Sequence, residues 1–349
     1  MDRFSQRQAS LLLSSPAKLR TIIAPFFYNT STRTCKMMST TNPNPQAAAP
    51  APSAAARQKM EMPPLIYGTA WKKERTADLV YQAIKAGFRG IDTAAMRRHY
   101  DEELTGHGIH RAIQEGLVTR ADLYIQTKFS PGDDAFADTT KYPTITSQVL
   151  ASVASSLRSL STPASDAETQ PPYLDSLVMH FPFHSPQDTL EAWATLSTLV
   201  PSQIRSLGIS NVTLPTLELL HHQSSTPISV VQNRFRRAEH AWDVAVRAWC
   251  AQHSAVYQGF WTLTGNRAEW QGSKFVRDVA EGAGVPLATA WYALLLAADI
   301  VVLDGTTDPV HMREDVEGVE KVAVWRGTEA GRLVWERSFE AFDRLVGGV

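Results

Sequence analysis

The sequence is poor in cysteine and contains no long uninterrupted hydrophobic run. Its two cysteines, Cys35 and Cys250, are too few for a disulfide framework, which is typical of proteins from a reducing compartment. The longest apolar stretch, around Trp291–Leu303, is interrupted by Asp299 and is shorter than the roughly 20 apolar residues of a membrane span. We interpret this stretch as a buried helix followed by a buried strand, and expect no membrane association.

The sequence also lacks an excess of either charge. Its 34 basic and 35 acidic residues leave a net charge of −1, so nucleic acid and anionic membranes are not expected as partners. The histidines do not pair with carboxylates or thiolates at the spacing of metal ligands, and no metal site is predicted.

The first 62 residues differ from the rest in composition. Up to Cys35 they are rich in Ser, Thr and Arg, with Asp2 as the only acid, a composition that fits a mitochondrial transit peptide. The alternatives are a poorly ordered tail, or translation that begins at a later Met. Residues 40–57 are rich in Ala and Pro and cannot form a core. We predict a disordered extension over 1–62 and a folded domain over 63–349. The protein is expected in the cytoplasm, or in the mitochondrion if the extension is a transit peptide.

Short apolar segments alternate with amphipathic stretches eight times after Pro63. This order is typical of a parallel sheet covered by helices. The expected strands are 65–67, 89–92, 123–127, 176–179, 204–209, 229–231, 255–257 and 300–303. The expected helices are 76–86, 102–114, 145–160, 186–199, 214–222, 241–251, 274–283 and 310–322, followed by a last helix near 334–346.

Eight units favour an α/β fold of the (β/α)8 TIM-barrel type over an open sheet. No Gly-x-Gly-x-x-Gly follows the first strand, which argues against a Rossmann fold. Active sites of barrels lie at the carboxyl ends of the strands. The residues at these ends are Asp92, Lys128, His180, Ser210, Asn211, Gln232, Tyr257, Gln258, Gly305 and Thr306. One such residue alone is more often a helix cap, a surface lysine or a core histidine, but their recurrence at successive strand ends indicates a functional site.

Five segments, in order, resemble the aldo-keto reductase family. They are GIDTAAMRRHYDEE (90–103), LYIQTKFSP (123–131), LDSLVMHFP (174–182), SLGISN (206–211) and VVQNRF (230–235). The resemblance implies a (β/α)8 barrel and an NAD(P)H-dependent oxidoreductase that reduces the carbonyl of a small aldehyde or ketone to an alcohol. It also implies a monomer or a dimer.

By this resemblance the catalytic residues are Asp92, Tyr100, Lys128 and His180. The phenol of Tyr100 holds its proton at neutral pH and would donate it to the carbonyl oxygen, while the nicotinamide supplies the hydride. A charged Lys128, held by Asp92, would lower the pKa of Tyr100. His180 would position and polarise the carbonyl.

The resemblance also implies a site for NADP(H), with NAD(H) as the alternative. Its expected members are Thr69, Asp92, Ser210, Asn211, Gln232, Tyr257, Gln258, Phe260, Gly305, Thr306 and His311. Ser210, Asn211 and Gln232 would hydrogen-bond the nicotinamide carboxamide. Tyr257 would stack on the nicotinamide ring, and Gln258 and Phe260 would lie against the diphosphate. Two tryptophans, at 71 and 261, are candidates for the wall of the substrate pocket, with a core position as the alternative.

The spacing from Asp to Tyr is longer than the family's usual one by roughly one helical turn. The usual spacing would place Arg97 at the proton donor's position, and arginine cannot act as that acid. Tyr100 is followed by Asp101 and Glu102, much as the family's tyrosine is followed by Asn-Glu, and the longer spacing resembles that of a fungal subgroup. We therefore expect the loop to fold back and present Tyr100 beside Lys128.

The segment after the eighth strand also departs from the family. Many members have a lysine and a serine there, then an arginine that binds the 2′-phosphate of NADP. Here Gly305, Thr306 and His311 stand near those places, which predicts a weaker preference for the phosphorylated cofactor. Arg313 is a candidate substitute.

Two other functions stay open from the sequence. The displaced tyrosine and the altered phosphate site are compatible with a regulatory subunit that binds NADP(H) without turnover. A lyase with Lys128 as Schiff-base nucleophile is the second alternative. That function would leave the expected nicotinamide contacts without a role.

Overall fold

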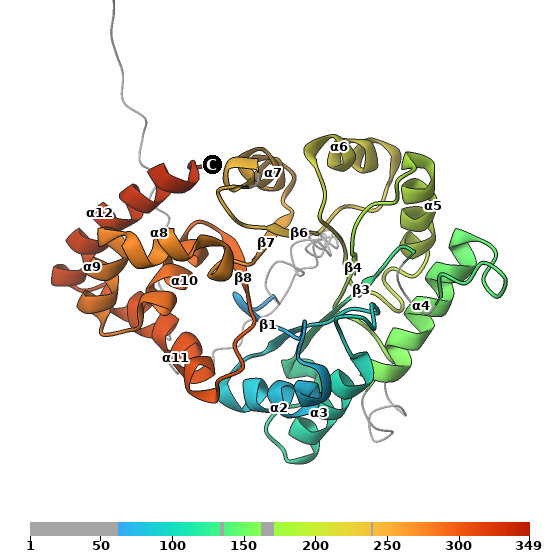
Figure 1. Cartoon of the computed structure of the whole chain (residues 1–349), viewed down its shortest axis with the longest axis horizontal. Coiled ribbons are helices and arrows are strands. Elements are labelled where there is room, and N and C mark those ends of the chain that lie inside the picture. Colours follow the sequence, from blue (N-terminus) through green and yellow to red (C-terminus); the bar gives the residue numbers. More distant parts are fainter. Residues whose placement is uncertain (1–61, 133–135, 162–170, 239) are drawn as a thin grey trace, which may run out of the picture. The chain divides into compact units, whose positions relative to one another are not determined.

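The computed structural model describes residues 62–132, 136–161, 171–238 and 240–349. The predicted extension, with its transit-peptide and linker interpretations, lies outside these residues apart from Met62. Within the described part, eight parallel strands close into a barrel in sequential order, and the helices surround it (Figure 1). The predicted (β/α)8 barrel is confirmed.

The strands are short, and their order in the barrel follows their order in the chain. Their bounds are β1 (Leu65–Gly68), β2 (Gly90–Asp92), β3 (Tyr124–Phe129), β4 (Ser176–Met179), β5 (Leu207–Ser210), β6 (Val230–Arg234), β7 (Val256–Phe260) and β8 (Ile300–Asp304). Each pairs in parallel with the next, and β1 pairs with β8. Gly68 lies opposite Asp92, which lies opposite Gln126, so the carboxyl ends of neighbouring strands come together.

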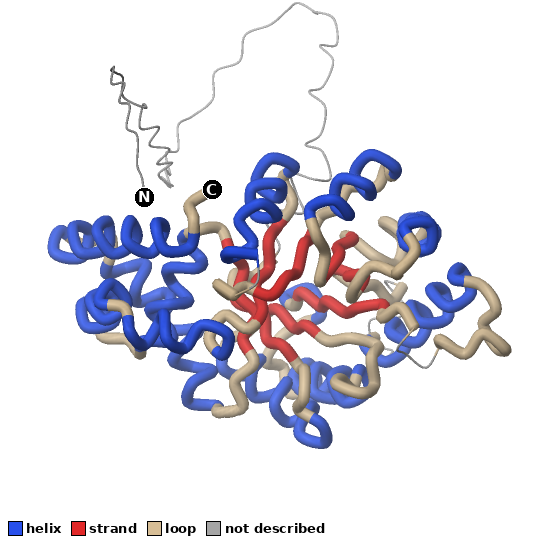
Figure 2. Tube along the Cα trace, turned by 45° about the horizontal axis from the view of Figure 1, so that its top comes forward, coloured by secondary structure: helices blue, strands red, loops and turns tan. Residues whose placement is uncertain are grey.

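The α-helices form the outer layer around the strands (Figure 2). Their bounds are α2 (Thr76–Ala86), α3 (Glu102–Gln114), α4 (Ile145–Leu160), α5 (Pro186–Ser197), α6 (Leu214–Gln223), α7 (His240–His253), α8 (Arg267–Gly272), α9 (Lys274–Ala283), α10 (Leu287–Ala297), α11 (Pro309–Trp325) and α12 (Glu329–Val346). Three short 3-10 helices, η1 (Lys73–Arg75), η2 (Arg120–Asp122) and η3 (Thr264–Asn266), complete the described helices. Gly87 ends α2 in the left-handed conformation, with φ of 111°, which glycine adopts without steric cost.

The connection from β7 to β8 holds more structure than the single amphipathic helix 274–283 predicts. It contains α8, α9 and α10. Residues 289–295 of α10 are all buried, so this helix is apolar around its circumference and has no amphipathic period. For that reason the sequence indicated a buried helix near Trp291 without indicating its bounds.

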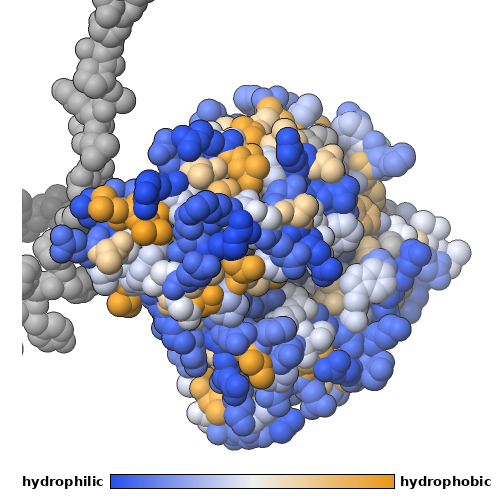
Figure 3. Space-filling model, turned by 60° about the vertical axis from the view of Figure 1, so that its left-hand side comes forward, coloured by the Kyte–Doolittle hydropathy of each residue, from blue (hydrophilic) through white to orange (hydrophobic). Residues whose placement is uncertain are grey.

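The surface over the helices that follow β7 is largely hydrophilic. Figure 3 shows this face with hydrophobic residues in small separate groups. Scattered apolar residues of this kind are normal on folded proteins. No single helix in the described part of the chain is both long and apolar enough to cross a membrane; α9 and α10 satisfy that test only jointly, and they are bent by 103°.

Candidate active site

Side chains along β3 alternate in direction, so Gln126 and Lys128 point into the barrel and Thr127 points out of it. Gln126 hydrogen-bonds Gln258 of β7, a strand that does not neighbour β3, so the two side chains meet inside the barrel. Thr127, the next residue, donates instead to Glu102 of α3 in the outer layer. Lys128 therefore points inward again, because successive side chains of a strand alternate between its faces.

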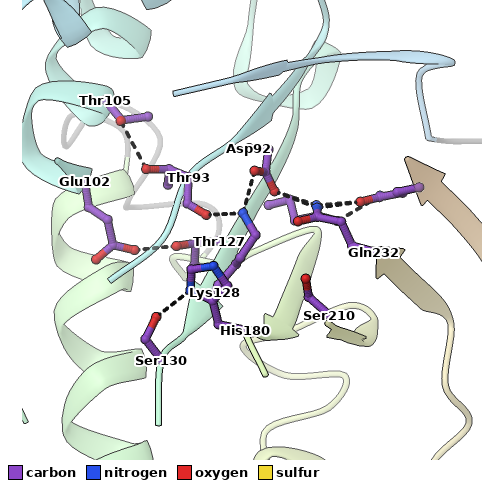
Figure 4. Close-up of polar contacts among 12 residues, drawn as sticks. Asp92, Thr93, Glu102, Thr105, Thr127, Lys128, Ser130, His180, Ser210 and Gln232 are labelled. Carbon is purple, nitrogen blue, oxygen red and sulfur yellow. Dashed lines mark hydrogen bonds and ion pairs between the residues drawn. The ribbon is translucent and has the colours of Figure 1, made fainter. Parts of the chain in front are cut away.

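Lys128 and Asp92 form a buried ion pair at the carboxyl ends of β3 and β2. The distance between Nζ and the carboxylate Oδ2 is 2.5 Å, and the side chains are 1% and 2% exposed (Figure 4). The ammonium also donates to the backbone carbonyl of Thr93, 2.9 Å away. The charge of Lys128 is thus fixed in place by two oxygen acceptors.

A single turn accommodates the long spacing between Asp92 and Tyr100. The amides of Thr93 and Ala95 first extend the pairing of β2 with β3 by donating to the carbonyls of Gln126 and Lys128. The chain then turns through residues 96–100, where the amide of Tyr100 donates to the carbonyl of Met96, 3.0 Å away. The side chain of Asp101 accepts from the amide of Leu104 and starts α3 immediately afterwards.

This turn brings the ring of Tyr100 close to both Lys128 and His180. The Nζ atom of Lys128 lies 5.1 Å from the centre of the Tyr100 ring, and the Tyr100 and His180 ring centres are 5.9 Å apart. Arg97, at the usual spacing, is exposed. Burial raises the pKa of Tyr100 above its ordinary value; Lys128 acts in the opposite direction, as expected, but does not outweigh burial.

His180 follows β4 and is held by a residue that the sequence analysis did not select. The hydroxyl of Ser130, fully buried at the end of β3, lies 2.8 Å from Nδ1 of His180. Burial, assisted by the charges of Lys128 and His99, lowers the pKa of His180 to about 3. The imidazole is therefore neutral at physiological pH.

Below the ion pair, three glutamines form a hydrogen-bonded cluster inside the barrel. The amide nitrogens of Gln126 and Gln232 lie 2.7 Å and 3.1 Å from Oδ1 of Asp92, the oxygen that Lys128 does not use. Gln258 exchanges hydrogen bonds with Gln126 and accepts one from Gln232. Asp92 thus receives hydrogen bonds on both carboxylate oxygens, which hold the side chain in place.

The residues expected at the nicotinamide carboxamide lie together at the ends of β5 and β6. Asn211 donates to the carbonyl of His180 and to the hydroxyl of Ser210, at 2.9 Å and 3.1 Å. Gln232 is buried, and its amide nitrogen is committed to Asp92 and Gln258. Only the side-chain oxygen of Gln232 is left for a contact with a carboxamide.

The expected roles of Tyr257 and Gln258 on β7 are wrong, because Tyr257 points out of the barrel and Gln258 points into it. Tyr257 points out of the barrel: it is 3% exposed, and its hydroxyl donates to Asp243 of α7, 3.0 Å away. It is not placed to stack on a nicotinamide. Gln258 points into the barrel and is fully buried in the glutamine cluster, so it does not lie in a loop against a diphosphate. Phe260, at the end of β7, is partly exposed.

The remaining cofactor expectations fall around β1 and β8. Thr69 is fully buried after β1, and its amide donates to the carbonyl of Asp92. Gly305 and Thr306 follow β8, and their carbonyls accept from Lys72 Nζ and from the Tyr67 hydroxyl. His311 is exposed on α11, as is Arg313. Lys72, which the sequence analysis did not select, thus reaches the strand end where a cation was missing.

Two exposed tryptophans flank the mouth of the barrel. Trp71 is 63% exposed and packs against His99, with 3.8 Å between ring centres. Trp261 is 49% exposed, and the guanidinium of Arg234 lies 4.4 Å from its ring centre. Both tryptophans have positive φ, 64° and 59°, which is uncommon outside glycine and recurs at functional sites. Neither is a core residue, so the pocket-wall interpretation is the one that remains.

The comparisons with known proteins identify the family of the chain. Residues 64–269 match the model of the Aldo/keto reductase family. The chain belongs to this family. An aldo-keto reductase of Bombyx mori is 36% identical over 140 residues, 38% of this chain and 39% of that protein. An NAD(P)H-dependent D-xylose reductase of Pachysolen tannophilus is 30% identical over 180 residues, 44% and 50% of the two chains. The chain thus spans half the length or less of these two relatives.

Solved structures of aldo-keto reductases share the fold. A crystal structure of another Bombyx mori aldo-keto reductase, complexed with NADPH, has a TM-score of 0.60 at 21% identity and covers 76% of this chain and 84% of its own. A Bombyx mori structure in complex with NADP has a TM-score of 0.58 at 22% identity, covering 75% and 88%. At these identities the likeness concerns the barrel itself.

Proposed function

We propose that this aldo-keto reductase reduces the carbonyl group of a small aldehyde or ketone with NADPH, with NADH as the alternative. The observation that carries the proposal is the convergence of Tyr100, Lys128 and His180 at one end of the barrel. Membership of the family, the aldo-keto reductase structure complexed with NADPH and the related NAD(P)H-dependent D-xylose reductase support the cofactor and the reaction class. The fit is also chemical: Ser210 and Asn211 offer a hydroxyl and an amide to a carboxamide, and Lys72 offers a cation to a phosphate.

The bound nicotinamide would supply the hydride. Tyr100 donates its phenolic proton to the carbonyl oxygen, and its raised pKa keeps that proton in place until charge develops on the substrate. Lys128 stabilises the phenolate that remains, because its ammonium is held charged by Asp92. In the tautomer in which Ser130 donates to Nδ1, neutral His180 would present Nε2–H to the carbonyl oxygen and polarise it.

The test follows NADPH oxidation with small aldehydes, ketones and D-xylose for wild type and Tyr100→Phe. We expect the substitution to lower kcat/KM by roughly 10² to 10⁴, the range of general acid catalysis, without weakening NADP⁺ binding. Tyr142→Phe, the same change outside the site, serves as the matched control. Full activity in Tyr100→Phe would show that another group donates the proton.

A second candidate function is a regulatory subunit that binds NADP(H) without turnover. The loss of the expected nicotinamide stacking by Tyr257 favours it, because that contact orients the ring for transfer. Tight NADPH binding by wild type without oxidation of NADPH by any carbonyl compound would support this function. Borohydride trapping of a carbonyl substrate on Lys128 would instead support a lyase.

A further inference from the structure

Gln258 of β7 is the centre of the hydrogen-bonded cluster inside the barrel. Its side-chain oxygen accepts from the amide nitrogens of Gln126 and Gln232, at 2.9 Å and 2.8 Å. Its own nitrogen donates to the oxygen of Gln126, 3.0 Å away, and to the sulfur of Met62, 3.4 Å away. The side chain is fully buried, so these contacts within the protein hold it in place.

Asp92 dictates the direction of the hydrogen bonds in this cluster. Its carboxylate, ion-paired with Lys128, accepts hydrogen bonds and cannot donate them, so Gln126 and Gln232 present their amide nitrogens to it. Figure 4 shows the Gln232 amide beside Asp92. Each nitrogen carries two N–H groups, and the second N–H of each is directed at the oxygen of Gln258. The amide orientations of all three glutamines are therefore determined by one carboxylate.

The same orientation determines what Gln232 can offer to a ligand. Both of its N–H groups are used inside the cluster, and its oxygen forms no hydrogen bond among the described residues. At the end of the neighbouring strand β5, the nitrogen of Asn211 is likewise used, by the carbonyl of His180 and the hydroxyl oxygen of Ser210. Two amide oxygens and one hydroxyl donor thus remain. A primary carboxamide, with two N–H donors and one acceptor oxygen, is the complementary group.

The contribution of Gln258 is the second hydrogen bond of the Gln232 nitrogen. A single hydrogen bond to Asp92 would let the amide rotate about that bond, whereas two acceptors fix the amide plane and with it the direction of the oxygen. Among the described residues, Gln258 forms no hydrogen bond with Asp92 itself. Its influence on the site therefore passes through Gln232 and Gln126.

We propose that Gln258 is a positioning residue that fixes the Gln232 amide, so that the Gln232 oxygen accepts from the carboxamide of the nicotinamide. This inference rests on the proposed function, because it concerns the same cofactor. Loss of the Gln258 amide should therefore weaken the binding of a cofactor that has the carboxamide N–H groups. It should weaken the binding of a cofactor without those groups much less.

The experiment measures dissociation constants of NADP⁺ and of its 3-acetylpyridine analogue by calorimetry. In the analogue a methyl ketone replaces the carboxamide, so the acceptor oxygen is kept and the N–H donors are absent. Gln258→Met removes the amide at similar side-chain length. We expect it to weaken NADP⁺ binding by about 3- to 10-fold, the range of one neutral hydrogen bond, and binding of the analogue by less than about twofold. Gln148→Met, the same change at a buried glutamine of α4, should alter neither constant.

Gln258→Glu is the conservative variant, and it provides the test where Gln258→Met does not fold. A protonated glutamic acid retains an acceptor oxygen for Gln126 and Gln232 and an O–H donor for Gln126. Burial near the charge of Asp92 favours this protonated form. At about pH 5 we expect Gln258→Glu to bind NADP⁺ within about twofold of wild type, and to distinguish it from the analogue as wild type does.

Three results would overturn the proposal. In the first, folded Gln258→Met binds NADP⁺ as wild type does. In the second, it loses affinity for NADP⁺ and for the analogue equally, which is the result of a purely structural role. In the third, folded Gln258→Glu at about pH 5 no longer distinguishes the two ligands. Failure of the proposed function is a different result, in which wild type binds neither NADP⁺ nor NAD⁺.

Discussion

Two buried lysines, Lys128 and Lys72, lie at strand ends of the same barrel in different electrostatic surroundings. Lys128 is 1% exposed and forms an ion pair with Asp92 and a hydrogen bond with the Thr93 carbonyl. Lys72 is 8% exposed and among the described residues binds one carbonyl, that of Gly305. Burying a charge is costly unless it is paired. Lys128 is therefore balanced by a direct ion pair with Asp92, whereas Lys72 forms no ion pair within the described residues and has the buried carboxyl group of Asp304 nearby.

Removal of the Lys128 charge should give the largest effect. We expect Lys128→Met to lower kcat/KM for carbonyl reduction by roughly 10² to 10⁴, because the Tyr100 phenolate loses its stabilising cation. Lys128 opposes the rise in the pKa of Tyr100, so the substitution should raise that pKa further and move the basic limb of the pH–rate profile upward. Steady-state kinetics over a pH series measures both effects.

The controls for this variant address folding and charge. Lys128→Met leaves Asp92 without its ion-pair partner in a buried site, which costs about 3–5 kcal/mol of stability, so thermal unfolding must accompany the kinetics. Lys274→Met removes an exposed lysine with the same change of charge. An unshifted basic limb in a folded Lys128→Met variant would contradict the role assigned to Lys128.

A substitution in the glutamine cluster under Asp92 should have a smaller effect than Lys128→Met. It also tests the surroundings of Lys128 rather than those of Lys72. Gln126→Leu removes a donor to Asp92 and both hydrogen bonds between Gln126 and Gln258. We expect a loss of about 1–3 kcal/mol in the free energy of unfolding, because buried polar groups are left unpaired. We also expect kcat to fall more than KM rises, since Asp92 then holds Lys128 less firmly.

Gln148→Leu is the matched control for this variant. Gln148 is also buried, but it lies on α4 and donates to the carbonyl of Tyr142, away from Asp92. We expect it to lower stability without changing kcat. Equal effects of the two variants on kcat would show that the glutamine cluster only supports the fold.

The strand-end chemistry of β2 to β4 could be predicted because it depends on local pattern. Asp92 and Lys128 each end an apolar strand and His180 follows one, and the carboxyl ends of parallel strands meet. Tyr100 required a loop conformation that spacing alone does not supply; a single turn from Met96 provides it. The placement of all eight strands followed from the same alternation of apolar segments and helices.

The β7 and β8 region could not be predicted in the same way. A shift of one residue exchanges the inward and outward faces of a strand, and this shift separates the expected role of Tyr257 from its observed contact with Asp243. Lys72 lies in the loop after β1, yet its long side chain ends beside Gly305, 233 residues later in the chain. No sequence pattern within either segment predicts this contact between Lys72 and Gly305.

Asp304 and Asp315 form a buried carboxyl pair, and Asp304 acts on Lys72. Substitution of Asp315 should give the smallest effect when measured near pH 5, and the effect should depend on pH. Burial and the neighbouring Asp304 raise the pKa of Asp315 to about 8, from an ordinary value of 3.8. The folded state therefore binds more protons than the unfolded state between about pH 4 and 8, and stability falls as pH rises through that window.

Asn at this position can still accept the hydrogen bond of Thr289 but does not ionise. Asp315→Asn should thus match wild type near pH 5 and be more stable near pH 8, by up to about 4 kcal/mol for three pH units, in denaturant unfolding at the two pH values. An equal difference at both values would show that Asp315 does not titrate in this window, and that the surroundings of Lys72 keep the same charge throughout it.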